Sequence, residues 1–194
     1  MSTLLAVCVV EPLPADFFSR VAPLDIVPTR AELPPRSLFI DTFAWSPTRT
    51  TEVAEAVSRV VAGPVLGLLA QTTADVYQVT EFGAGRRLRE IAYSRDGDGW
   101  GPSAGEARAW EADFHFALPE AQFVEDLGYA EWDEAEIERA RAAYVARDLS
   151  LLPRLPDASS AQFYTFVEKL GLDPQAGFDA KYERPGFFRR LFRR

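Results

Sequence analysis

Several residue types that mark common classes of protein are almost missing from this 194-residue chain. Its one cysteine, Cys8, cannot form a disulfide within the chain, and its one histidine, His115, cannot supply a two-histidine iron site or a histidine–cysteine zinc site. No apolar run approaches the roughly 20 residues that a membrane-spanning helix requires. Glycine-rich phosphate-binding motifs and the G-x-S-x-G motif are also missing. We therefore expect no cofactor and favour a protein that is not an enzyme.

The composition that remains is that of an ordinary globular chain. Hydrophobic residues make up 47% of it and charged residues 26%, and a chain of this length can bury a core without a disulfide or a metal. The apolar segment 4–10 lacks the basic residues and the cleavage site of a signal peptide, so we interpret it as a first strand with Cys8 buried in it. These features predict a cytoplasmic protein.

Charge is distributed unevenly along the chain. The last eleven residues, 184–194, hold five arginines and no acidic residue, while the first 183 residues hold 16 basic and 29 acidic side chains, a net charge of −13. The sequence therefore predicts an acidic body, residues 1–183, with a basic tail. Because the whole chain carries a net charge of −8, nucleic acid is not an expected partner.

The pattern of apolar residues predicts an α+β fold. Strands are expected at residues 4–10, 37–45, 65–70, 75–82, 86–93 and 110–116, with a hairpin turn at residues 83–85 and an extended connection at residues 23–35. Helices are expected at residues 14–22, 51–62, 133–149 and from Ser159 or Ser160 to Gly171. The result is a mostly antiparallel sheet in the N-terminal two-thirds and a helical C-terminal third. Residues 1–183 form one domain on this interpretation, and a subdivision near residue 118 is the alternative.

One predicted strand carries a candidate site. If residues 110–116 alternate as a strand, Glu111, Asp113 and His115 share its polar face and could hold a divalent ion or move a proton. The alternative is a solvated outer face of a half-buried strand, which produces such sets routinely.

Two further polar segments have simple structural explanations. Residues 96–99, with the sequence Asp-Gly-Asp-Gly, lack the later ligands of a calcium loop and predict a turn. The acidic cluster at Glu131, Asp133, Glu134, Glu136 and Glu138 is typical of a solvated helix face, and its alternative role is to attract a basic partner.

The basic tail is the strongest candidate for a binding segment. Its apolar and basic residues alternate at near-helical spacing, which suits a partner groove or an anionic membrane surface, or packing against the acidic body of the same chain. The residues expected to bind are Phe187, Phe188, Arg189, Arg190, Leu191, Phe192, Arg193 and Arg194.

Residues 75–116 resemble a pattern found in small uncharacterised bacterial proteins. In that pattern an arginine-bearing strand ending in tyrosine, here Tyr93, is followed by a tryptophan, Trp100, a Gly-Glu turn and a Trp-Glu pair that begins at Trp110. Some proteins of this kind are thought to be immunity or antitoxin partners. The resemblance implies a protein that binds another protein, and it implies no catalytic residues. We expect the three aromatic side chains to pack together over a twisted hairpin.

Three functions follow from these observations. The first is a non-enzymatic protein-binding module of the bacterial cytoplasm, immunity-like or regulatory. The second is a peripheral membrane or scaffold protein recruited by the tail. The third is an enzyme or metal-binding protein that uses Glu111, Asp113 and His115.

Overall fold

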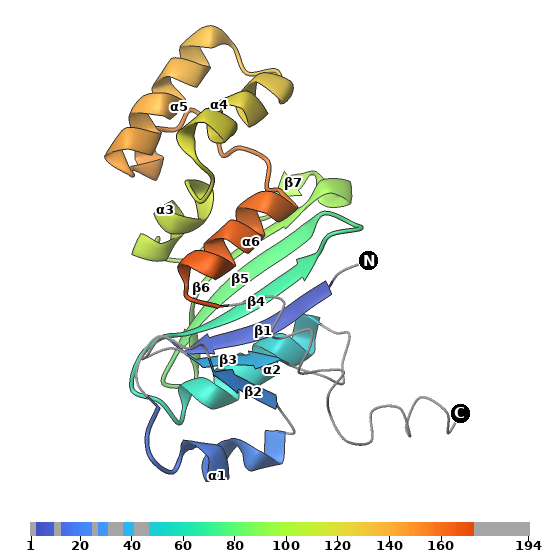
Figure 1. The fold of residues 1–194 in the computed structure, drawn as a ribbon, viewed down its shortest axis with the longest axis vertical. Helices are drawn as coiled ribbons and strands as arrows, with labels where there is room; N and C mark the ends of the chain where they lie inside the picture. Colours follow the sequence, from blue (N-terminus) through green and yellow to red (C-terminus); the bar gives the residue numbers. More distant parts are fainter. Residues whose placement is uncertain (1–2, 10–12, 25–26, 31–36, 41–46, 173–194) are drawn as a thin grey trace, which may run out of the picture.

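An eight-stranded antiparallel sheet forms the centre of the protein, and the computed structural model describes residues 3–9, 13–24, 27–30, 37–40 and 47–172 (Figure 1). The strand order is β2-β3-β1-β4-β5-β6-β7, with β8 beside β6. The strands are β1 (Thr3–Val9), β2 (Val27–Arg30), β3 (Ser37–Ile40), β4 (Val65–Gln71), β5 (Val76–Gly83), β6 (Arg86–Ser94), β7 (Gly99–Trp100) and β8 (Ala104–Gly105). The sheet confirms the α+β class and the antiparallel pairing expected from the sequence.

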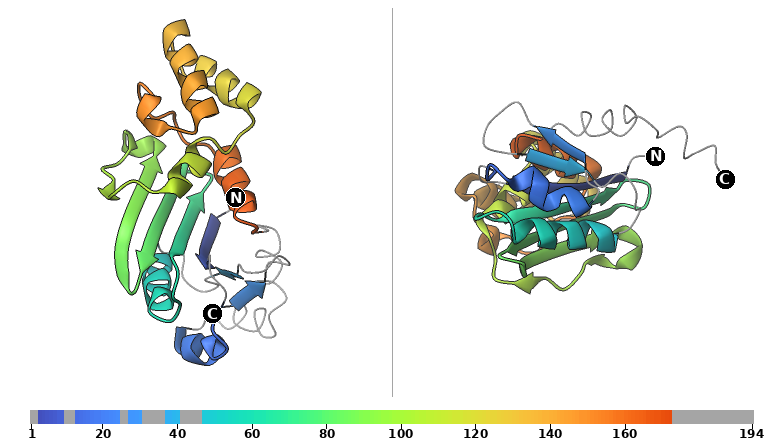
Figure 2. Two further views of the ribbon diagram at one scale, coloured as in Figure 1. Left: turned by 90° about the vertical axis from the view of Figure 1, so that its left-hand side faces the viewer. Right: turned by 90° about the horizontal axis from the view of Figure 1, so that it is seen from below.

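Helices cover both faces of this sheet and extend beyond one end of it (Figures 1 and 2). They are α1 (Phe17–Val21), α2 (Pro47–Ser58), α3 (Ala109–His115), α4 (Glu120–Tyr129), α5 (Glu134–Ala146) and α6 (Ser160–Lys169). Three short 3-10 turns lie between them, η1 (Ala22–Leu24), η2 (Arg95–Gly97) and η3 (Leu149–Leu151).

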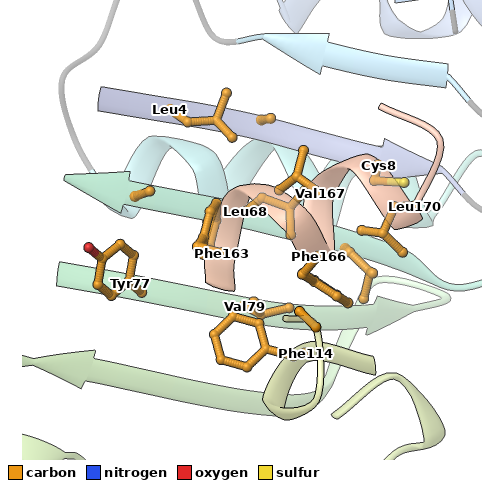
Figure 3. Close-up of a cluster of buried hydrophobic side chains, with 14 of the residues drawn as sticks. Leu4, Cys8, Leu68, Tyr77, Val79, Phe114, Phe163, Phe166, Val167 and Leu170 are labelled. Atoms are coloured by element: carbon orange, nitrogen blue, oxygen red, sulfur yellow. The ribbon is translucent and has the colours of Figure 1, made fainter. Parts of the chain in front are cut away.

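The two faces of the sheet belong to two separate apolar clusters because side chains alternate along each strand. On one face, Val7 and Val9 of β1 pack with Val53 and Val57 of α2. On the other face, Cys8 of β1 joins a cluster with α6, which lies across the middle strands in Figure 3. The members that Figure 3 labels are Leu4, Cys8, Leu68, Tyr77, Val79, Phe114, Phe163, Phe166, Val167 and Leu170. Cys8 is fully buried, as predicted.

The strong sequence patterns produce the elements that they predict. Strands β1, β4, β5 and β6 lie at the predicted places, and the β5–β6 turn has Ala84 and Gly85 in left-handed conformations. Ser159 caps α6 in a capping box with Gln162, and Asp133 caps α5 in the same way with Glu136. Residues 96–99 form the predicted turn.

Several predicted boundaries differ from the structure, among them the helices predicted at residues 14–22 and 133–149, which form Phe17–Val21 and Glu134–Ala146. Helix α2 begins at Pro47 and ends at Ser58, whereas the sequence predicted residues 51–62, because proline is favoured in the first turn of a helix and the chain turns after Ser58. The connection 23–35 contains the short strand β2 at the sheet edge, where its proline at position 28 is tolerated. Residues 10 and 41–45, predicted as strand, lie outside the described residues.

The strand predicted at residues 110–116 is wrong, since this segment forms helix α3. The alternating pattern arises because α3 lies between two clusters. Phe114 packs into the cluster beneath α6, while Phe116, just after the helix, packs into a third cluster with Phe123 and Leu127 of α4. A short helix that is buried on two sides has apolar residues on both of those sides. Along the sequence, these residues can then alternate with polar ones as they do in a strand.

After Leu118 the chain leaves the sheet and forms the helical hairpin, defined here as α4, α5 and the loop between them (Figure 1). The hairpin has its own core, in which Trp132 and two alanines of α5 pack against α4. It stands beyond the end of the sheet in Figure 1 and in the left view of Figure 2. The chain then returns to the sheet through α6.

Candidate functional site

The three polar residues proposed as a strand-face site do not converge. On α3, Glu111 points to the sheet and binds Arg89 of β6, whereas Asp113 is exposed and pairs with Arg147 at 2.5 Å. His115 is buried between aromatic rings. A helix turns by about 100° per residue, so residues two apart point in different directions. The structure therefore corrects the proposed metal or proton-transfer face.

Glu111 and Arg89 form a buried ion pair that fixes α3 on the sheet. Arg89 Nε donates to Glu111 Oε1 at 2.9 Å and its Nη2 donates to Oε2 at 2.6 Å, while Nη1 donates to the carbonyl of Gly105 at 2.7 Å. The backbone N–H of Arg108 donates to the same carboxylate, which caps the helix. Each guanidinium nitrogen of Arg89 thus donates a hydrogen bond and both carboxylate oxygens of Glu111 accept one, which gives the pair a structural role.

Residues 75–116, the segment with the family resemblance, contribute two tryptophans, Trp100 and Trp110, to the packing around α3. Trp100 contacts Tyr93 with ring centroids 5.3 Å apart, as expected, and the two residues are paired across β6 and β7. Trp110 joins the same cluster through Phe166, at 6.3 Å, and its Nε1 donates to Glu81 at 2.7 Å. These contacts hold the β6–β7 edge against α3.

A cavity of about 390 Å³ lies where the sheet end, α3, α4 and the start of α6 meet. Its apolar lining comes mainly from Leu118, Phe123, Leu127, Pro156 and Ala158. Its polar lining includes Asp75, Arg95, Asp126, Asp157, His115 and Gln162. Apolar walls with a few convergent polar groups are typical of small-molecule sites.

Carboxylates dominate the charge of this cavity. Asp75 is neutralised locally, because it pairs with Arg95 at 2.9 Å and accepts a hydrogen bond from Tyr77 at 3.0 Å. Asp126 and Asp157 form no ion pair with any residue that the structure describes. Partial burial, and then the neighbouring charge of Glu125, raises the pKa of Asp126 above its usual value.

His115 is the most deeply buried polar group of the cavity. It is 2% exposed, with ring centroids 4.9 Å from Trp100 and 5.3 Å from Phe114. Its Nδ1 is buried and has no hydrogen-bond partner in the described part of the chain. Burial, and to a smaller extent the charge of Arg89, lowers the pKa of His115 to about 4, so the imidazole is neutral at pH 7.

The helical hairpin carries the second feature of the site, an exposed acidic surface. Residues 119–147 include eight acidic and three basic side chains. Within the predicted acidic cluster, Asp133 and Glu136 form the α5 capping box, while Glu131, Glu134 and Glu138 are exposed. The capping box has a structural role, whereas Glu131, Glu134 and Glu138 are available to a partner.

Two apolar side chains stand out beside these charges. Tyr129 at the end of α4 is 78% exposed, and Val145 on α5 is 73% exposed. Val145 lies on the same exposed face of α5 as Glu134, Glu138 and Arg141, at helical spacings of four and three residues. We call these four residues the α5 outer face.

The hairpin is tied firmly to the rest of the protein. Arg147, which caps α5, donates to the carbonyl of Phe116 at 2.9 Å and pairs with Asp113 of α3. Lys169 of α6 donates to the carbonyl of Ala117 at 2.6 Å, and Tyr144 donates to that of Leu118 at 2.9 Å. These bonds hold the segment that enters the hairpin, so the α5 outer face has a fixed position relative to the sheet.

The tail proposed from the sequence, residues 184–194, lies outside the described residues. Within those ranges, no helix is long and apolar enough to cross a bilayer. The same ranges hold no cluster of three or more His, Cys, Asp or Glu side chains placed to bind a metal ion.

The acidic cluster and His115 are recognisable in the sequence, whereas the cavity is not. The cavity lining comes from segments between residues 75 and 162, and their meeting depends on the path of α4, which no local motif records. The sequence offered the lone histidine as a signal but placed it on a polar strand face, and its burial is visible only in the structure. Comparison with protein-family models, with curated proteins and with solved structures finds no match for this chain.

Proposed function

We propose that the protein is a non-enzymatic protein-binding module of the bacterial cytoplasm, immunity-like or regulatory, and that the helical hairpin contacts the partner. The observation that carries this proposal is the α5 outer face. It presents Glu134, Glu138 and an exposed Val145 on an element that stands beyond the sheet.

Charge selects the kind of partner. The hairpin has an excess of acidic side chains, and the first 183 residues have a net charge of −13, so the partner surface is basic. The exposed Val145 lies beside these charges. It can pack against the partner once water is excluded from the interface, and this apolar contact contributes to binding. The resemblance of residues 75–116 to immunity-like proteins supports the same kind of function.

Quantitative capture from native lysate tests the proposal. The bait is the full chain, and the variant Glu134→Lys/Glu138→Lys reverses two charges on the α5 outer face. The matched control, Glu52→Lys/Glu55→Lys, reverses the charges of the exposed Glu52 and the half-buried Glu55 on α2, on the far side of the sheet from the hairpin (Figure 1). We expect one near-stoichiometric basic protein, with recovery reduced about tenfold by the α5 variant and unchanged by the α2 control.

Other results would contradict the proposal. Equal loss in the two variants would indicate only a general effect of net charge. A partner that binds both variants fully but is lost when the chain ends at Glu183 would assign binding to the tail and not to the hairpin. No enriched protein with any bait would contradict a protein-binding module.

A further inference from the structure

The cavity at the base of the helical hairpin has the features of a built ligand site that is separate from the α5 outer face. Its volume of about 390 Å³ lies within the range of small-molecule pockets. One wall is apolar, formed by Leu118 and by Phe123 and Leu127 of α4. These three side chains are buried, and two of them belong to the packed helix α4, so the wall is preformed.

The cavity lining also contains acidic side chains. Asp126 of α4 and Asp157, from the segment before α6, both belong to it, and neither forms an ion pair with the described residues. Among the described residues that line the cavity, the one cation is Arg95, which is already paired with Asp75. Both carboxylates are exposed to solvent, and Asp157 accepts a hydrogen bond from the Tyr93 hydroxyl. They lie beside apolar surface without an ion-pair partner in the described part of the chain, and a cation with an apolar body matches this arrangement.

A deeply buried polar group provides independent support. His115 lines the cavity and its Nδ1 lacks a hydrogen-bond partner among the described residues, although buried polar atoms are normally satisfied. The neutral imidazole adds a polar group without a positive charge that would repel a cation. At the cavity edge, the exposed ring of Tyr129 is available for a cation–π contact.

We propose that this cavity binds a small organic cation, a protonated amine or guanidinium carried on an aromatic or short alkyl body. The apolar body lies against Leu118, Phe123 and Leu127, and the cationic group lies between Asp126 and Asp157. This inference does not depend on the protein-binding function, since none of the residues of the α5 outer face lines the cavity.

The lone histidine allows a direct test on the unmodified full chain. In protein labelled with ¹⁵N-histidine, every imidazole signal belongs to His115. The probe is phenethylammonium, and its matched controls are neutral 2-phenylethanol and anionic 3-phenylpropionate. We expect a saturable shift of the His115 signals with the cation and at least tenfold weaker effects with both controls. No saturable shift with the cation, or equal shifts with the neutral alcohol, would overturn the proposal.

Two variants on α4 distinguish a site from general attraction to an acidic protein. Asp126→Asn removes a cavity carboxylate, whereas Glu120→Gln removes the same charge from an exposed position outside the cavity. We expect about tenfold weaker binding for Asp126→Asn and unchanged binding for Glu120→Gln. Equal weakening by the two would overturn the proposal.

A third comparison separates this inference from the proposed function. The Glu134→Lys/Glu138→Lys variant is expected to bind phenethylammonium with wild-type affinity even though it loses the protein partner. The two proposals can therefore fail independently, because cation binding and capture of the protein partner are measured separately. Loss of cation binding in this variant would contradict a self-contained cavity.

Discussion

At the scale of single residues, His115 makes folding sensitive to mild acid. The imidazole has a pKa of about 4 in the folded protein against an ordinary value of 6.5, because burial and Arg89 disfavour its charged form. Between these two pH values the unfolded chain binds a proton that the folded chain does not. Stability contributed by this group is therefore complete above pH 6.5 and is lost as the pH falls towards 4.

Replacing this histidine with an uncharged ring tests the effect. From pH 7 to pH 4, the wild type is expected to lose about 3 kcal/mol more of its unfolding free energy than His115→Phe, which retains a ring beside Trp100. Urea unfolding at a series of pH values measures this difference. Parallel pH profiles for the two proteins would show that the imidazole titrates normally.

The buried pair of Arg89 and Glu111 predicts a large loss of stability when one partner is neutralised. Glu111→Gln leaves a buried guanidinium without its counter-charge and is expected to destabilise the fold by about 3 kcal/mol. The matched control is Glu90→Gln, which breaks the more exposed pair with Arg87 and is expected to change stability by less than about 1 kcal/mol. Equal losses in chemical denaturation would contradict the structural role of the buried pair.

At the scale of elements, the sequence was informative where one local pattern determined the outcome. The cap at Ser159 and the glycine-bearing turn between β5 and β6 indicated the correct elements because their signals depend on neighbouring residues. Helix α3 was mistaken for a strand because its environment is determined by distant elements. Phe114 contacts α6 and Phe116 contacts α4, so the pattern of burial reflects two clusters rather than one strand face.

The short strand β8 depends on one glycine. Gly105 has φ of +80°, and a Cβ there would lie 1.9 Å from the carbonyl oxygen of Leu88. Gly105→Ala is therefore expected to cost roughly 2–4 kcal/mol or to detach β8 from β6. Gly101→Ala, where the added atom meets only an ordinary 3.7 Å contact, is the control and should cost less than about 1 kcal/mol.

Thermal unfolding and amide hydrogen exchange measure both consequences. Faster exchange limited to residues near Arg89 and Gly105 would indicate local detachment, and a lower melting temperature would indicate loss of global stability. A Gly105→Ala protein that matches Gly101→Ala in both measurements would contradict the close approach of β8 to β6.

At the scale of the whole molecule, the proposed recognition surface lies apart from the core of the sheet. The cluster between the sheet and α6 buries the aromatic side chains of Tyr77, Tyr93, Phe114, Phe163 and Phe166. The helical hairpin, in contrast, places acidic residues and Val145 in solvent. The sequence predicted the acidic character of this region, because charge is additive along a chain. It could not predict that the hairpin stands beyond the sheet, which results from long-range bonds such as those from Arg147 and Lys169.

The proposed contact through the hairpin is tested most directly by site-specific photocrosslinking in native cells. A photoreactive phenylalanine analogue is placed at position 145 on α5 or, as a control, at position 52 on α2, in the otherwise unmodified full chain. We expect one discrete crosslinked protein with a basic surface from position 145 and none from position 52. Crosslinking only from position 52, or none from position 145 while a partner is still captured, would contradict the assignment of the helical hairpin as the binding surface.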